Sequence, residues 1–177
     1  MTALQSHPLR TNSLAAGFIG ASGDGIAQQI ECRYGDATSN WDVVRTGQMF
    51  AFCCAWLGVP QVMWFRTLAR RFPEGTPSRL RKKLAVHLGL MAPTTNALFF
   101  AYREALRESH DDTSWAARYA RRMQHEFPPT IAYSLCFWTP AQAINFTFVP
   151  LPLRPLYLNG MMVVWTTYLS IAGHRRY

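Results

Sequence analysis

Long uncharged stretches separated by basic clusters dominate the pattern of this chain. Asp, Glu, Lys and Arg are missing from four of them: residues 46–65, 84–102, 127–153 and 155–173. An α-helix needs roughly 20 residues to cross a bilayer, which is close to the length of the shorter stretches. A soluble helix instead carries charged residues at short intervals along its solvated face. The pattern therefore predicts membrane-spanning helices rather than the soluble alternative.

A fifth stretch, residues 11–30, contains Asp24 as its one acidic residue. Small residues recur there every four positions, on one helix face: Ser13, Gly17, Ala21 and Gly25. Such a face lets another helix approach closely. Asp24 and Gln28 lie on the neighbouring face. Either this polar pair faces protein or water beside the close contact, or Asp24 caps a local break in a glycine-rich segment.

We therefore expect an all-α fold: a multi-span transmembrane helical bundle of four to five spanning helices, forming one integral-membrane domain over residues 1–177. Pro60 should kink the second span or end its regular part. Between the third and fourth spans, residues 111–127 place an aromatic or apolar side chain at every fourth position: Trp115, Tyr119, Met123 and Phe127. Arg118, Arg121 and Arg122 lie off that stripe. This predicts an amphipathic helix, either at the membrane surface or packed on other loops.

Composition agrees with this picture once the charges are seen to be segregated. The chain is 49% hydrophobic and 16% charged, with a formal net charge of +8. The basic residues flank apolar stretches, so anionic lipid headgroups are favoured as partners over nucleic acid, which we do not expect to bind directly. Candidate headgroup contacts are Arg66, Arg70, Arg71, Arg81, Lys82 and Lys83. Arg154, between the last two stretches, would satisfy helix carbonyls at a turn or bind a headgroup.

Catalytic chemistry is not indicated. The glycines match no phosphate-binding loop, the histidines form no metal-spaced pair, and the four cysteines imply neither a metal site nor disulfides. We expect no enzyme, no metal and no cofactor other than bound phospholipid, with cardiolipin a candidate. Polar residues inside the uncharged stretches remain, and they either line a solute pathway or bond helices together. They include Asp24, Gln28, His87, Asn96, Gln142 and Asn145.

The chain resembles, over nearly its whole length, the family of the 22-kDa peroxisomal membrane protein and its mitochondrial inner-membrane relatives, the Mpv-seventeen family. The closing segment carries the most specific resemblance: Trp138, Gln142, Asn145-Phe146, Val149-Pro150, Arg154, Trp165 and Tyr168-Leu169-Ser170. Earlier positions agree as well: Gly23-Asp24, Ala27-Gln28-Gln29, Asp42, Arg45, Gly47, Trp64-Phe65, Ala92-Pro93 and Phe127-Pro128.

The resemblance implies a small integral protein of the mitochondrial inner membrane, with the peroxisomal membrane as the alternative, that forms a channel-like pathway for small solutes. This chain departs from the family pattern where His87-Leu88 replaces an Asp-Gln pair, and where Pro60 and Pro140 are each displaced by one position. The lost acid supports the alternative function, a non-conducting structural subunit of a large inner-membrane complex. The expected partners are membrane lipids and either further copies of the chain or the subunits of that complex.

Overall fold

The computed structural model describes residues 8–34, 41–72, 77–107, 114–149 and 154–174. These residues are helical apart from short turns, and no strand occurs among them, which confirms the all-α prediction. The elements are α2 (Pro8–Tyr34), α3 (Val43–Phe52), η1 (Cys53–Gly58), α4 (Val59–Arg71), α5 (Pro77–Val86), η2 (His87–Met91), α6 (Ala92–Leu106), α7 (Trp115–His125), α8 (Phe127–Thr147) and α9 (Arg154–His174).

Among the described residues, two continuous helices are long and apolar enough to cross a membrane: Val43–Leu68 and Arg81–Leu106. Both coincide with predicted spans, at residues 46–65 and 84–102. The prediction of four to five spans goes beyond this finding and stays a prediction. So does the single domain over residues 1–177, because the contacts of the chain divide into two units, residues 1–66 with 149–177 and residues 67–148.

Each of these two long helices contains a π-helical turn just before a proline. The turn η1 ends at Gly58, two residues before Pro60, and η2 ends at Met91, two residues before Pro93. Proline lacks an N–H and its ring collides with the carbonyl four residues earlier in a regular α-helix. A π turn holds one extra residue and shifts that carbonyl. The expected disturbance at Pro60 is therefore a π turn within an unbroken helix.

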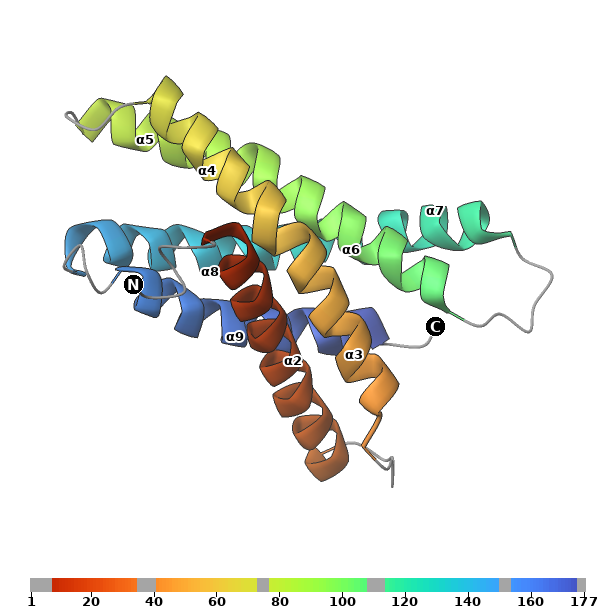
Figure 1. Cartoon of the computed structure of the whole chain (residues 1–177). Helices are drawn as coiled ribbons and strands as arrows, with labels where there is room; N and C mark the ends of the chain where they lie inside the picture. Colours follow the sequence, from red (N-terminus) through yellow and green to blue (C-terminus); the bar gives the residue numbers. More distant parts are fainter. Residues whose placement is uncertain (1–7, 35–40, 73–76, 108–113, 150–153, 175–177) are drawn as a thin grey trace. The chain divides into compact units, whose positions relative to one another are not determined.

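In the first unit, α2 packs against α3, η1 and α9 (Figure 1). Glycines of α2 make these contacts close, because a Cβ at Gly20 would lie 2.4 Å from the Cys53 sulphur of η1. A Cβ at Gly23 would lie 2.0 Å from the Thr166 hydroxyl of α9. Close approach through the face of Gly17 was expected and is confirmed, because a Cβ at Gly17 would lie 2.4 Å from the Cys54 sulphur of η1. The alternative that Asp24 caps a break is wrong, because α2 runs unbroken from Pro8 to Tyr34.

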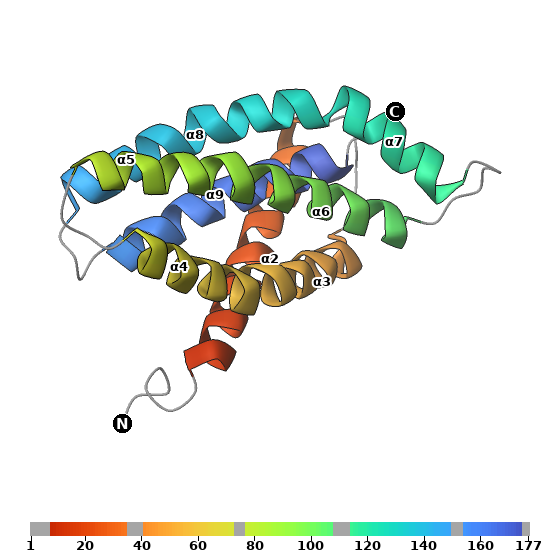
Figure 2. The same cartoon turned by 90° about the horizontal axis from the view of Figure 1, so that it is seen from above.

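In the second unit, α8 runs alongside η2 and α6 in the opposite direction, and α7 packs on both α6 and α8 (Figure 2). The outer faces of its helices are apolar: Leu90, Leu98, Tyr133, Leu135 and Ile144 are exposed. The buried face of α8 is polar instead, with Thr130, Ser134, Gln142 and Asn145. An apolar outside around a polar inside is the polarity of a protein in lipid.

Candidate functional site

The first unit contains a buried ion-pair cluster around Asp24, in the middle of α2. The Asp24 side chain is fully buried, and one carboxylate oxygen, Oδ1, accepts a hydrogen bond from Arg45 Nε of α3 at 2.8 Å. The same oxygen accepts the Ser170 hydroxyl of α9. The consecutive helices α2 and α3 and the distant helix α9 therefore meet at one carboxylate oxygen.

The second carboxylate oxygen of Asp24 is bonded as fully as the first. Oδ2 accepts hydrogen bonds from the Thr46 hydroxyl at 2.7 Å and from the Gln28 amide nitrogen at 2.8 Å. Gln28 extends the network, because its amide oxygen accepts the backbone N–H of Asp42 at 2.7 Å. A carboxylate with four donors is stabilised in its charged form even where water is excluded.

Arg45 supplies the positive charge of this cluster. Its guanidinium bonds Glu31 in a two-pronged pair, at 2.5 and 3.0 Å, and donates to the Ser170 hydroxyl at 3.0 Å. The planar fork of arginine can serve Asp24, Glu31 and Ser170 together, which the single ammonium of lysine cannot. Asp42 holds the arginine in place from the backbone side, since its carboxylate caps α3 by accepting the Arg45 N–H.

The sequence left two roles open for the polar residues, lining a solute pathway or bonding helices together. In this geometry Asp24 and Gln28 bond helices together. Sequence reasoning missed Arg45, Glu31 and Thr46 as members of the cluster. One signal was present: an acid inside an apolar helix needs a basic partner, and Arg45 stands at the border of the next uncharged stretch. The role of Ser170 had no such signal, because it depends on how α9 crosses α2.

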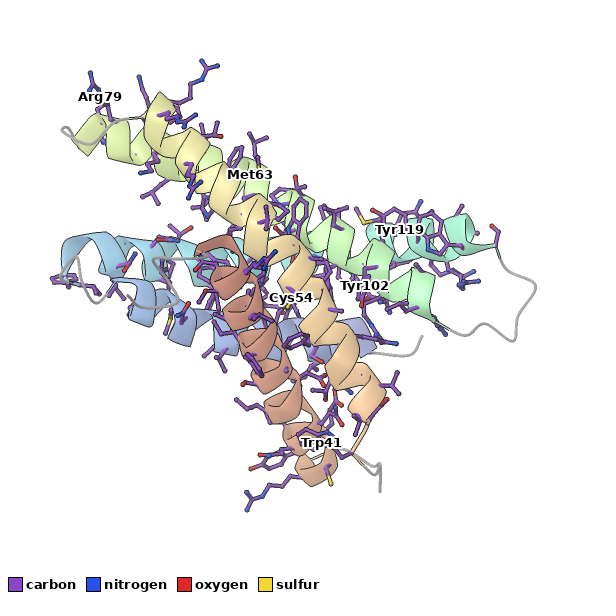
Figure 3. The ribbon with its side chains drawn as sticks, in the orientation of Figure 1. Trp41, Cys54, Met63, Arg79, Tyr102 and Tyr119 are labelled. Atoms are coloured by element: carbon purple, nitrogen blue, oxygen red, sulfur yellow. The ribbon has the colours of Figure 1, made fainter. Side chains whose placement is uncertain are left out.

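The second unit has its own ion-pair cluster, at Glu104 near the end of α6. Glu104 is buried and lies 3.3 Å from the nearest guanidinium nitrogens of both Arg118 and Arg122 of α7. Arg122 also pairs with Glu126 at 3.1 Å and stacks over the Phe100 ring. The Tyr119 hydroxyl donates a hydrogen bond to the Ala97 carbonyl of α6 at 3.4 Å. Figure 3 labels Tyr119 on α7.

These contacts decide how α7 is held. The amphipathic helix expected at residues 111–127 is present as Trp115–His125, and Ser114 caps it. Arg118 and Arg122 lie off the aromatic stripe, and a buried carboxylate on α6 nevertheless draws both arginines inward. Trp115 stacks on Tyr119 and stays exposed. The packing of α7 on α6 and α8 favours the packed alternative, although contact with a membrane surface through Trp115 stays open.

Three further polar residues of the second unit are buried without a hydrogen-bond partner for one of their side-chain atoms. Asn96 of α6 and Gln142 and Asn145 of α8 each bury an amide oxygen that has no hydrogen-bond donor within reach among the described residues. Gln142 and Asn145 are three positions apart and share one face of α8. The amide nitrogen of Asn96 does have a partner, the Ala92 carbonyl of its own helix at 2.9 Å.

The remaining predicted residues lie at the places the sequence suggested, without forming a further described cluster. His87 is half-buried at the start of η2. Arg66, Arg70, Arg71, Arg81 and Lys82 are exposed and Lys83 is half-buried, and their contact with headgroups stays a prediction. Arg154 begins α9, and its side chain lies outside the described residues. Among the described residues, no group of three His, Cys, Asp or Glu side chains could hold a metal ion.

Comparison with known proteins agrees with the helical, lipid-facing character of the chain. The Mpv17 / PMP22 family matches residues 114–170, which run from the start of α7 into α9. No solved structure matches the chain significantly.

Full-length relatives extend the match. The mitochondrial inner membrane protein Mpv17 of Bos taurus is 30% identical over 173 residues, which cover 98% of this chain and 94% of that protein, and the Homo sapiens protein matches equally. Protein sym-1 of Neurospora crassa is 31% identical over 94% of this chain and 92% of its own length. The expected location is thereby confirmed: the chain belongs to the Mpv17 / PMP22 family and is a protein of the mitochondrial inner membrane.

Proposed function

We propose that the chain provides a channel-like pathway for small polar solutes across the inner membrane, and that the second unit carries it. The observation behind this proposal is the set of buried amide oxygens at Asn96, Gln142 and Asn145. A buried acceptor without a donor costs about 1–3 kcal/mol, so a native structure keeps one where something outside the protein satisfies it. Polar side chains at membrane depth commonly face a wet cavity.

The buried face of α8 fits such a pathway chemically. Thr130 and Ser134 continue the row of Gln142 and Asn145 toward the start of the helix, at intervals that keep all four near one face. Hydroxyls and amides can exchange hydrogen bonds with water or a solute at little cost. None of these four residues is ionised, so a solute would meet no strong electrostatic trap on this face.

The proposal is tested with purified full-length protein in liposomes, by the release of a small entrapped solute. Asn145→Leu keeps the side-chain size and removes the acceptor oxygen, and we expect it to lower the release rate. Asn159→Leu is the matched control, because Asn159 is an exposed amide on α9. Equal release by the wild type, Asn145→Leu and Asn159→Leu, or release no faster than from protein-free liposomes, would overturn the proposal.

One observation favours the second candidate, a non-conducting subunit that contacts lipids and neighbouring proteins. Asp24, the acid that a pathway through the first unit would use, is bonded on both oxygens and fully buried. Native electrophoresis of mild-detergent mitochondrial extracts distinguishes the candidates. Co-migration with a large complex, together with liposomes that do not leak, would favour the subunit. A small oligomer with solute release would favour the pathway.

A further inference from the structure

A notch at the C-terminal end of α2 borders the ion-pair cluster, with which it shares Gln28, and lies outside the proposed pathway. It encloses about 460 Å³ and is lined by Gln28, Gln29, Cys32, Arg33 and Trp41. This volume is within the range of small-molecule sites. Figure 3 shows Trp41 at the end of the first unit where α2 and α3 adjoin. All its lining residues belong to the first unit, so the notch is defined within that unit alone.

Arg33 provides the positive charge of the notch. It lies in the last turn of α2, is exposed, and has no described carboxylate within ion-pairing distance. The nearby Glu31 is already held by Arg45 in the two-pronged pair. Gln29 lies one helical turn before Arg33 on the same face and is also exposed. A guanidinium and an amide N–H₂ one turn apart are suitable donors for a phosphate group.

Trp41 forms a fixed wall of the notch because α2 has a glycine beneath it. A Cβ at Gly25 would lie 2.9 Å from Cη2 of the Trp41 ring, so the ring sits directly on the helix backbone. About half of the Trp41 side chain remains exposed. Tyr34, at the end of α2, is exposed as well. Exposed tryptophan and tyrosine side chains mark the level where lipid headgroups meet the hydrocarbon.

Apolar side chains continue from the notch along the same helix face. Ile26 and Ile30 are exposed, and each lies three residues before one of the polar pair Gln29 and Arg33. At helical spacing these four residues form one surface, in which a polar part, Gln29 and Arg33, alternates along α2 with an apolar part, Ile26 and Ile30. A free phosphate ion would use the polar part alone. A phospholipid would use both parts, with its acyl chains along the isoleucines.

We propose that this notch binds the phosphate of an anionic phospholipid headgroup, through Arg33 and Gln29, against the wall of Trp41. The site differs from the basic residues of α4 and α5 that the sequence suggested for headgroups, because it combines a cation with a shaped wall and an apolar continuation. It stands independently of the proposed solute pathway, which lies in the second unit.

Native mass spectrometry of the full chain, titrated with phosphatidylglycerol in detergent, tests the proposal. Arg33→Gln removes the cation, and Arg10→Gln removes an exposed arginine near the other end of the same helix. We expect Arg33→Gln to weaken binding of the first lipid about fivefold, the contribution of one basic residue near an anionic lipid surface. Arg10→Gln should leave it unchanged. Equal weakening by both variants, or by neither, would overturn the site.

Gly25→Ala tests the wall without removing a polar group, since its Cβ would displace the Trp41 ring. Gly47→Ala is its control, because a Cβ there meets nothing within 4 Å. Weaker lipid binding by Gly25→Ala alone, with helix content unchanged, is expected, and wild-type binding would contradict the wall. An excess of inorganic phosphate should not release the lipid. Its release, or equal binding of phosphatidylcholine, would overturn the assignment to an anionic lipid.

Discussion

Both units of this protein bury a satisfied ion-pair cluster, but the second unit also buries amide oxygens that have no described hydrogen-bond donor. In the first unit, both oxygens of the Asp24 carboxylate and all three nitrogens of the Arg45 guanidinium form hydrogen bonds. The cluster joins α2, α3 and α9. In the second unit, the amide oxygens of Gln142 and Asn145 are as deeply buried but have no described donor. Satisfied groups hold a structure together, whereas unsatisfied ones are retained for a partner outside the chain.

The largest effect is expected from Arg45→Leu, which attacks the satisfied cluster. It would leave Asp24 and Glu31 as neighbouring negative charges without their common cation. Breaking a buried pair in this way costs about 3–5 kcal/mol. For a chain of this size that corresponds to a loss of roughly 10 °C in melting temperature. Thermal unfolding in detergent, followed by circular dichroism, measures it.

Arg10→Leu is the control for Arg45→Leu, because Arg10 is exposed on α2. The double variant Asp24→Leu with Arg45→Leu should lose less stability than the two single variants added together, since the pair acts as a unit. A melting temperature of Arg45→Leu within a degree or two of the wild type would show that the cluster does not hold the first unit.

Glu104→Gln should have the next largest effect, and it would be confined to the second unit. A neutral amide cannot balance Arg118 and Arg122, and hydrogen bonds to charged groups contribute about 1.5–3 kcal/mol each. We expect α7 to loosen from α6 before the rest of the protein unfolds, seen as faster hydrogen exchange over residues 115–125. Glu126→Gln, at a less buried carboxylate that also pairs with Arg122, should give a smaller change. Unchanged exchange in α7 would contradict the role of Glu104.

Gly23→Ala tests the close contact of α2 with α9. Its new methyl group would overlap the Thr166 hydroxyl, and such overpacking costs about 1–3 kcal/mol. Gly47→Ala adds the same methyl group to a helix in open space and should instead stabilise by up to about 1 kcal/mol, from helix propensity. Melting temperatures that move in opposite directions confirm the contact. A shift of the same sign and size in both variants would count against it.

Asn145→Leu is expected to have the smallest effect on stability and the largest effect on solute release. Asn145→Leu replaces a buried amide that has an unsatisfied oxygen, so stability should stay level or rise by about 1 kcal/mol while solute release falls. Denaturation and release are measured on the same preparation. A loss of stability comparable to that of Arg45→Leu would mean that Asn145 is part of a satisfied network, and the difference between the units would disappear.

Several features could be predicted from the sequence because they depend on local spacing. The helices over residues 46–65 and 84–102 follow from the gaps between charges, and the close packing of α2 follows from its small residues at every fourth position. The burial of Asp24 and Gln28 followed from the same spacing. The groups that hydrogen-bond these two residues could not be predicted from spacing, because Arg45 and Ser170 reach Asp24 only through tertiary packing.

Other features were hidden for a physical reason. The burial of Arg122 could not be predicted, since charge ordinarily avoids the interior and only the position of Glu104 on another helix draws it inward. The notch at Arg33 depends on Trp41 lying over Gly25, a contact between residues from two different helices. In the sequence, Gly25 suggested a packing position, and nothing indicated that it meets Trp41.

The π turns before Pro60 and Pro93 are equivalent to one-residue insertions that the helices have absorbed. Deleting one residue within Cys53–Gly58 would restore regular α-helical hydrogen bonding and keep the residues on either side of the turn on their original faces. The restored helix would then bring the Pro60 ring against a backbone carbonyl. Proline and π turn therefore form an interdependent pair, so a relative that lacks one is expected to lack the other, and alignments should place a gap at this turn.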